Sequence, residues 1–175
     1  THTVTSVRPS DNWAYYEDGV LTLYNYRGNG SGIEFGNIDL TIVSSGDGNS
    51  INCITSEYDY ANLIIEGTAT LTVGHAQWTD YAIQVYSSII FRCDTVVECI
   101  DCTAIADTEA IIVDGAEVEV YAYIDTNSSN TIYGCEAPIT VVYGSLYLYC
   151  NDDNVITDSF VFNTSDVVVY ANNNL

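Results

Sequence analysis

A hydrophobic pattern recurs along this chain about every 24 residues, and it constrains the fold more than any other feature. Each copy consists of two short runs of β-branched residues separated by a tight turn of small residues. The anchor of each copy is the last apolar residue expected to face inward before that turn. The anchors are Ile42, Ile65, Phe91, Val113, Val141 and Phe162, at steps of 23, 26, 22, 28 and 21 residues. A period in the twenties with strand-type patterning is typical of stacked coils, each of which buries its apolar face on the next.

The turns inside the copies have similar lengths. In one copy the first inward residue after the turn, Leu71, is expected six positions after its anchor. In four copies this separation is expected to be five, in the pairs Phe91/Val96, Val113/Val118, Val141/Leu146 and Phe162/Val167. No segment combines a helical apolar period with helix caps, and Val, Ile, Tyr and Thr are abundant. We therefore expect an all-β fold, a parallel β-solenoid (β-helix) of about six coils.

The N-terminal residues differ from the repeats. Residues 1–12 contain alternating Thr and Val, a strand pattern that ends at Pro9 because proline cannot donate to a sheet ladder. We expect an N-terminal strand arm over residues 1–12 and one β-solenoid domain over residues 13–175.

One further strand is expected before the first anchor. Val20 opens a run of alternating apolar residues that continues to Tyr26. An Asp18-Gly19 turn precedes this strand, and a Gly-rich turn over residues 27–32 follows it.

The charge excludes several partners. The chain carries 24 acidic residues against three arginines and no lysine, a net charge of −21. Nucleic acid is excluded because phosphate binding needs a cationic surface, and anionic membranes repel such a chain. No apolar run is long enough to insert into a membrane, and the chain starts at Thr1 rather than at Met. We expect a mature protein that works outside the cell or at the cell surface.

Cysteines and glycosylation sequons agree with that location. The chain has six cysteines, an even number, and N-glycosylation sequons at Asn29, Asn127 and Asn163. An oxidising compartment is expected, in which disulfides form. The pairing cannot be chosen from sequence, and buried free thiols are the alternative.

A family resemblance rests on the N-terminal third and on the repeat rhythm. The matching segments are residues 13–26, 32–33, 38–42, 60–61, 63–73 and 81–83. They resemble the W-x-Y, LTLNNYxGxGI, dLTI and repeated YGI…LTI.G.g.LtV motifs of bacterial surface β-helix domains. These domains are common in gut Firmicutes and are labelled carbohydrate-binding domain-containing. The resemblance implies a β-helix with a carbohydrate-binding role, while the wealth of cysteine and tyrosine and the lack of lysine depart from the family pattern.

Tyrosines are the first candidate site residues, at 15 in the chain. Tyr121, Tyr149 and Tyr170 each lie eight residues after an anchor, so they should lie along one face of the solenoid, about 4.8 Å apart. Exposed rings stack on the apolar C–H face of sugars, while tyrosine also serves as a strand former and ladder filler. The carbohydrate-binding residues that we predict are Tyr121, Tyr143, Tyr147 and Tyr149.

Acidic corners are the second candidate. Asp152, Asp153 and Asp158 offer oxygen ligands of the kind that calcium takes. Turn formation explains Asp and Asn at such corners equally well. No cofactor is expected apart from calcium at this corner.

Catalysis is not expected. A lyase or hydrolase that acts on acidic polysaccharide would need cationic residues in its groove, and only Arg92 lies in the body of the expected coils. His2 and His75 have no nucleophile motif nearby. Cys99 and Cys102 form a CxxC pair with no second pair to complete a zinc site and no βαβ context for redox chemistry.

The two ends of the solenoid suggest self-association. A detachable strand arm could add to the open edge of a neighbour's last coil, and a head-to-tail contact of this kind produces filaments. The alternative is that the chain is a fragment of a longer protein. The residues expected to take part in assembly are Thr3, Val4, Thr5 and Val7 of the arm and Val167, Val168 and Val169 of the last coil.

Two functions of different classes follow. The first is a non-enzymatic, extracellular structural β-solenoid that assembles with copies of itself into a surface fibre or filament. The alternative is a carbohydrate-binding or adhesive module that binds polysaccharide through aromatic and Asp/Asn ladders on one face.

Overall fold

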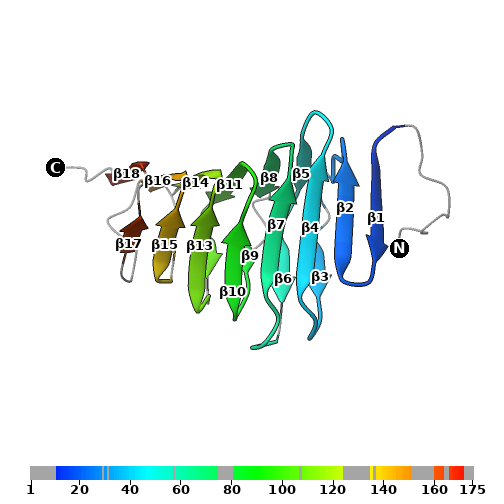
Figure 1. Cartoon of the computed structure of the whole chain (residues 1–175), viewed down its shortest axis with the longest axis horizontal. Coiled ribbons are helices and arrows are strands. Elements are labelled where there is room, and N and C mark those ends of the chain that lie inside the picture. Colours follow the sequence, from blue (N-terminus) through cyan, green and yellow to red (C-terminus); the bar gives the residue numbers. More distant parts are fainter. Residues whose placement is uncertain are drawn as a thin grey trace.

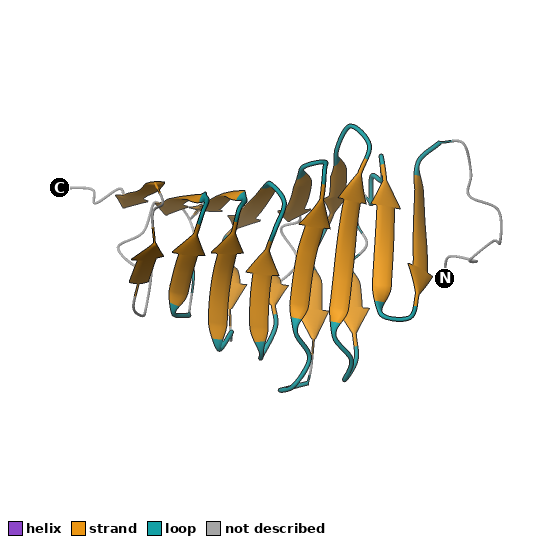
Figure 2. Cartoon of the chain, in the orientation of Figure 1, coloured by secondary structure: helices purple, strands orange, loops and turns teal. Residues whose placement is uncertain are grey.

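The strands of the molecule form an elongated stack of coils (Figures 1 and 2). The computed structural model describes residues 11–28, 30, 32–56, 58–74, 81–106, 108–123, 135, 137–150, 160–163 and 166–171. These ranges contain strands, turns and bends and no helix. β1 lies at one end of the long axis of the stack, and β17 and β18 lie at the other end (Figure 1).

Three sheets line the stack, named here in the order in which the chain passes through them. The first sheet consists of β1 (Trp13–Glu17), β2 (Val20–Tyr24), β4 (Leu40–Ser45), β7 (Leu63–Gly67), β10 (Ser88–Phe91), β13 (Ala110–Asp114), β15 (Ile139–Val142) and β17 (Phe160–Asn163). The second sheet consists of β5 (Asn49–Ile51), β8 (Leu71–Gly74), β11 (Thr95–Ile100), β14 (Glu117–Tyr123), β16 (Ser145–Cys150) and β18 (Asp166–Ala171). The third sheet consists of β3 (Ile33–Phe35), β6 (Ile54–Ser56), β9 (Tyr81–Gln84) and β12 (Thr103–Ala106).

All strand pairs except β1–β2 are parallel, which confirms the predicted parallel β-solenoid. About four turns contribute a strand to the third sheet, compared with the six coils expected from the anchors. The later turns keep their strands in the first two sheets, and Cys135 adds an isolated bridge to Ile105.

The strand register confirms every predicted anchor step. Ile42 pairs with Ile65, Ile65 with Phe91, Phe91 with Val113, Val113 with Val141 and Val141 with Phe162. The first five of these side chains are fully buried. Over these five anchors the repeat is therefore an inward column in which each apolar side chain packs against its equivalent in the adjacent coil.

One predicted inward pair is wrong by one residue. Thr95, not Val96, pairs with Leu71 and Val118 and is buried, whereas Val96 is only half-buried. The Thr95 hydroxyl donates a 2.9 Å hydrogen bond to the Cys93 carbonyl. That bond satisfies the buried polar group, so threonine occupies the inward position at little cost and the turn after Phe91 is one residue shorter than expected.

The inward column of the second sheet, to which Thr95 belongs, begins with another polar residue. Asn49 is 1% exposed and pairs with Leu71. Its side-chain amide donates to the Ser44 hydroxyl at 2.7 Å, and its side-chain oxygen accepts from the Tyr26 backbone N–H at 2.7 Å. Because all these groups have partners, the column tolerates asparagine inside the first coils.

A hairpin closes the N-terminal end of the first sheet. β1 and β2 are antiparallel and join through Asp18 and Gly19, both at positive φ, as expected for a two-residue hairpin turn. The predicted strand after this turn is confirmed over β2, but β1 itself was not predicted. Arg27, expected in a turn, forms an isolated parallel bridge with Ser50 and so belongs to the first coil.

Candidate functional site

The outer face of β14 and β16 carries the densest group of aromatic side chains that the structure describes. Strand residues alternate in direction, and the inward residues Val118, Val120, Leu146 and Leu148 are buried. The residues between them point outward. They are Glu117, Glu119, Tyr121 and Tyr123 on β14 and Ser145, Tyr147 and Tyr149 on β16.

Register brings the aromatic residues of neighbouring coils together. Tyr121 pairs with Glu98 on one side and with Tyr149 on the other, and Tyr149 pairs with Tyr170. The prediction that Tyr121, Tyr149 and Tyr170 lie along one face is therefore confirmed at the level of the backbone. Glu119 pairs with Tyr147, which places an acidic and an aromatic residue in the adjacent outward column.

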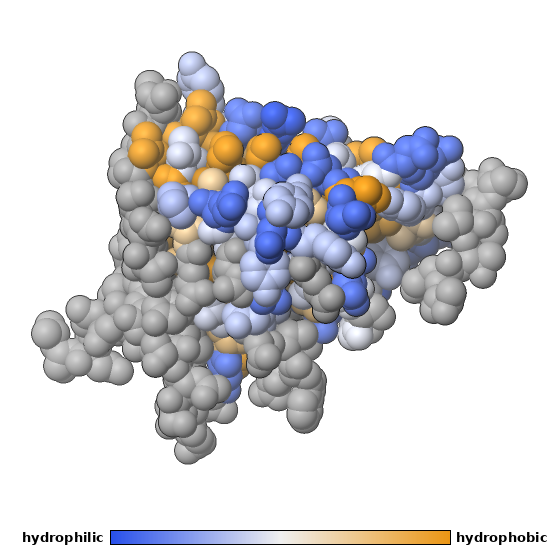
Figure 3. Space-filling view, turned by 90° about the horizontal axis from the view of Figure 1, so that it is seen from below, coloured by the Kyte–Doolittle hydropathy of each residue, from blue (hydrophilic) through white to orange (hydrophobic). Residues whose placement is uncertain are grey.

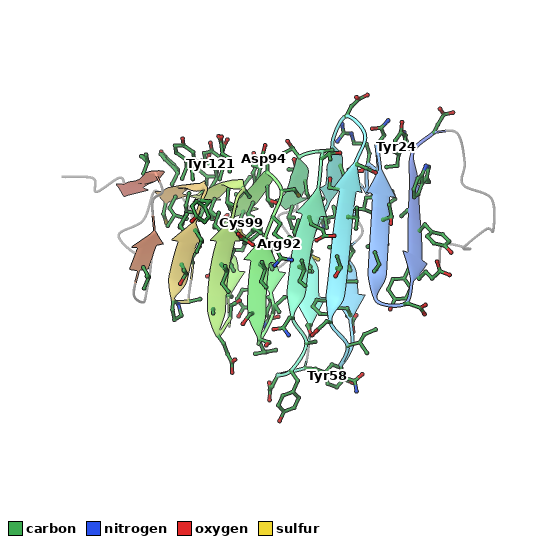
Figure 4. All side chains as sticks on the ribbon, viewed as in Figure 1. Tyr24, Tyr58, Arg92, Asp94, Cys99 and Tyr121 are labelled. Carbon is green, nitrogen blue, oxygen red and sulfur yellow. A yellow bond between two sulfur atoms is a disulfide. The ribbon has the colours of Figure 1, made fainter. Side chains whose placement is uncertain are left out.

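The rings form a compact cluster. The centroids of Tyr121 and Tyr123 are 6.1 Å apart with planes at 5°. The Tyr149 ring lies 6.2 Å from Tyr121 and 5.5 Å from Tyr123, tilted by 43° and 45°. Such separations are in the range where aromatic pairs attract each other, so the rings hold one another in place. Figure 4 shows Tyr121 in a group of side chains over β14 and β16, whereas Arg92 lies over the first sheet.

A depression of about 360 Å³ lies against this cluster. Its lining comes from β14 and β16 alone: Glu117, Glu119, Tyr121, Tyr147, Leu148 and Tyr149. We call these residues, together with Tyr123 and Glu98, the tyrosine surface. The combination of apolar ring faces with a few polar groups is typical of small-ligand sites.

The electrostatics of the tyrosine surface are negative. The Tyr121 hydroxyl donates a hydrogen bond to the Glu119 carboxylate. That bond, together with partial burial and the charges of Glu119 and Glu98, raises the pKa of Tyr121 to about 12, because each disfavours a second negative charge. Burial raises the pKa of Tyr123 too, with smaller contributions from Glu98 and Tyr149. Both phenols are therefore protonated and neutral at neutral pH.

Tyr143 does not belong to the cluster. It lies in the turn between β15 and β16 at φ 52°, and it is 71% exposed. Tyr123, in contrast, was not among the predicted carbohydrate-binding residues, although it belongs to β14 and its ring packs against those of Tyr121 and Tyr149. The signal that points to it is its spacing of two residues from Tyr121, which puts both rings on one side of a strand.

A second aromatic pair lies at the N-terminal end. Trp13 and Tyr24 are cross-strand neighbours in the hairpin, and their rings stack at 5.6 Å with planes at 10°. Neither ring of this pair lines the depression beside Tyr121.

Several predicted site residues lie outside the described residues. They are the calcium ligands Asp152, Asp153 and Asp158, the arm residues Thr3, Val4, Thr5 and Val7, and the sequons at Asn29 and Asn127. Asn163 ends β17, and Val167, Val168 and Val169 lie in β18, the terminal strand of the second sheet. Within the described residues, no group of three or more His, Cys, Asp or Glu side chains could hold a metal ion.

Five of the six cysteines are buried, and Cys53 is half-buried. Cys99 and Cys102 are joined as a disulfide across the corner between β11 and β12. Cys93, Cys135 and Cys150 are buried thiols. Burial raises the pKa of Cys93 to about 11 and that of Cys135 well above its usual range, so both are protonated at neutral pH and poorly reactive.

The fold and the tyrosine surface together define a parallel β-solenoid with an acidic, aromatic patch on one sheet. No family model matches the chain, and neither a curated protein nor a solved structure was found to be similar to it. None of the described segments is a helix of the length and apolarity needed to span a membrane.

Proposed function

We propose that this protein binds carbohydrate through the tyrosine surface, as an extracellular or cell-surface module. The observation that carries the proposal is the convergence of Tyr121, Tyr147 and Tyr149 on one depression, with Tyr123 packed against two of these rings. These side chains come from neighbouring coils, so the parallel register itself holds them in position.

The chemistry of this surface suits a sugar. Ring faces pack against the apolar C–H face of a pyranose, while carboxylates accept hydrogen bonds from its hydroxyl groups. Glu117 and Glu119 supply those carboxylates beside the rings. The resemblance to bacterial surface domains labelled as carbohydrate-binding leads to the same function.

A glycan array followed by titration of the best ligand tests this proposal. We expect Tyr149→Ala to weaken binding about tenfold or more, equivalent to ~1.4 kcal/mol. Tyr60→Ala is the matched control, because Tyr60 is 84% exposed and lies at a corner away from β14 and β16. An array without any retained glycan, or equal losses in both variants, would overturn the proposal.

Head-to-tail assembly into a surface fibre is a second candidate. It is favoured by an apolar depression of about 370 Å³ at the N-terminal end, lined by Tyr16, Leu21, Ile33, Glu34, Phe35, Gly36, Ile38 and Leu40. Ile38 is 51% exposed there, so an end of the core offers apolar surface to a partner. At this end of the stack, β1 pairs with β2 in the antiparallel sense and covers its edge. A partner's strands could therefore extend the parallel pairing only at the edge strands of the second and third sheets.

Electron microscopy and size-exclusion chromatography test assembly. We expect filaments from the full chain and their loss both in Ile38→Glu, which places a charge on the apolar depression, and in a variant that lacks residues 1–12. Particles of monomer size from the full chain at every concentration would rule out the fibre and leave the glycan proposal unaffected.

A further inference from the structure

We propose that the tyrosine surface selects amine-bearing glycans, that is, polysaccharides built from amino sugars without N-acetyl groups. This inference rests on the proposed carbohydrate-binding function and specifies its ligand class. The ligand would carry one ammonium group per sugar residue, and the protein would contact that group as well as the sugar ring.

The first argument is the charge around the rings. Glu98, Glu117 and Glu119 lie on the outward face of the second sheet, among or beside the tyrosines. The chain has no lysine. Of the arginines described, Arg92 forms an ion pair with Asp114 at 3.1 Å, and Arg27 lies in the first coil, with β5, β8 and β11 between it and β14. The field at the tyrosine surface is therefore negative, which attracts cations and repels uronic acids.

The second argument is the geometry of the rings. An ammonium group is attracted to the face of a tyrosine ring, and it forms strong hydrogen bonds with carboxylates. Tyr121, Tyr147 and Tyr149 line the same depression as Glu117 and Glu119, so one ammonium group could contact a ring and a carboxylate together. A neutral N-acetyl sugar offers the same ring but lacks that charge.

The third argument is the repeat distance. Adjacent strands of a sheet lie about 4.8 Å apart, which is close to the length of one sugar residue in an extended polysaccharide. Tyr121 and Tyr149 occupy equivalent positions in consecutive coils. A chain that runs along the long axis would therefore present successive sugar rings to successive coils, and in a β-1,4-linked chain every second amine would face the surface.

The test is isothermal titration with oligomers of β-1,4-linked glucosamine and, as the neutral counterpart, oligomers of N-acetylglucosamine of the same length. Oligogalacturonate serves as the anionic probe. We expect the glucosamine oligomer to bind about tenfold tighter or more than the N-acetylated one, and the galacturonate not to bind. Binding should weaken with added salt, and it should weaken when the pH rises above the pKa of the sugar amine.

Matched variants separate a specific site from general attraction to an acidic protein. Glu117→Gln/Glu119→Gln removes two charges from the tyrosine surface, whereas Glu17→Gln/Glu109→Gln removes two exposed charges elsewhere. We expect the first double variant to lose about tenfold in affinity for the glucosamine oligomer and the second to lose less than about twofold. Equal losses in the two variants would overturn the inference.

The outcomes distinguish the inference from the function on which it rests. Equal affinity for the amine and N-acetyl oligomers, still lost in Tyr149→Ala, would refute selection for amines and support carbohydrate binding. Failure of both oligomers to bind, with no other glycan retained on an array, would refute both proposals. Tight binding of the amine oligomer that survives Tyr149→Ala would refute the site.

Discussion

The outer faces of the first and second sheets belong to the same coils, yet their chemistry differs. On the first sheet one outward column is β-branched throughout: Val20, Thr41, Ile64, Ile90, Ile112, Thr140 and Val161. On the second sheet the column through β8, β11, β14, β16 and β18 is Gly74, Glu98, Tyr121, Tyr149 and Tyr170. Seen from below, the coloured part of the surface shows hydrophobic residues in several groups among hydrophilic ones (Figure 3).

The difference shows which positions the fold constrains. Inward residues contact their equivalents in the coils on either side, and a change of volume there creates a cavity or a clash. Outward residues need only suit a strand, a condition that isoleucine, threonine and tyrosine all meet. The β-branched column of the first sheet meets only that requirement, whereas the second sheet, in its later coils, brings rings and carboxylates together. For this reason the proposed binding site lies on the second sheet.

The largest effect is expected from an inward residue of the first sheet. Phe91→Ala removes a fully buried ring and should lower the free energy of unfolding by about 3–5 kcal/mol. That loss corresponds to a fall of roughly 6–20 °C in melting temperature for a chain of this size. Ile90→Ala is the control, because Ile90 is the half-buried neighbour in the outward column, and its cost should be about 1 kcal/mol. Similar losses in the two variants, measured by calorimetry, would contradict the assignment of inward and outward positions.

The second largest loss of stability is expected from a substitution at Gly74, which pairs with Glu98 on the second sheet. Gly74 has φ 112°, and a Cβ on it would overlap the Glu98 carbonyl oxygen. Gly74→Ala should therefore cost about 3 kcal/mol or more, through backbone strain and displacement of β11.

Gly36→Ala is the control for this substitution. A Cβ added to Gly36 meets no atom within 4 Å, so the unfolding free energy should change by less than about 0.5 kcal/mol. Denaturant titrations of both variants measure the difference, and a tolerated alanine at Gly74 would contradict the close approach of β8 and β11.

The anchors could be predicted because inward columns demand large apolar side chains at a regular spacing. The same reasoning failed at Thr95, since hydrophobicity ranks Val96 higher while the hydrogen bond to the Cys93 carbonyl makes burial of Thr95 inexpensive. β1 was missed although the Asp18-Gly19 turn is a strong hairpin signal, because the repeat suggested only parallel pairing.

The tyrosine surface could be predicted only in part. Tyr121 and Tyr149 follow from their distance to the anchors, and the register confirms that they are neighbours. The sequence could not exclude Tyr143 from the predicted binding residues. Its position in a turn at positive φ depends on the short connection between β15 and β16. Which rings touch depends on side-chain directions, and these follow from the register of a finished sheet.

The smallest expected effect is a change in titration at the tyrosine surface. The Tyr121 hydrogen bond to Glu119 raises the pKa of Tyr121 to about 12, from an ordinary value of 10.0. The unfolded chain therefore loses this proton at lower pH than the folded chain does. The resulting contribution to stability is complete below pH 10 and is lost as the pH rises from 10 to about 12.

Glu119→Gln removes the charge that opposes ionisation of Tyr121. The pKa of Tyr121 should therefore fall toward its ordinary value, and the stability of the variant should decline less across this pH interval. Tyrosinate absorbance, taken as the difference between each protein and its Tyr121→Phe derivative, isolates this one phenol among the 15 tyrosines. If the pKa of Tyr121 is the same in the unaltered protein and in the Glu119→Gln variant, the Glu119 carboxylate does not control the electrostatics at the rings. The two outer faces would then differ only in the packing of their aromatic side chains.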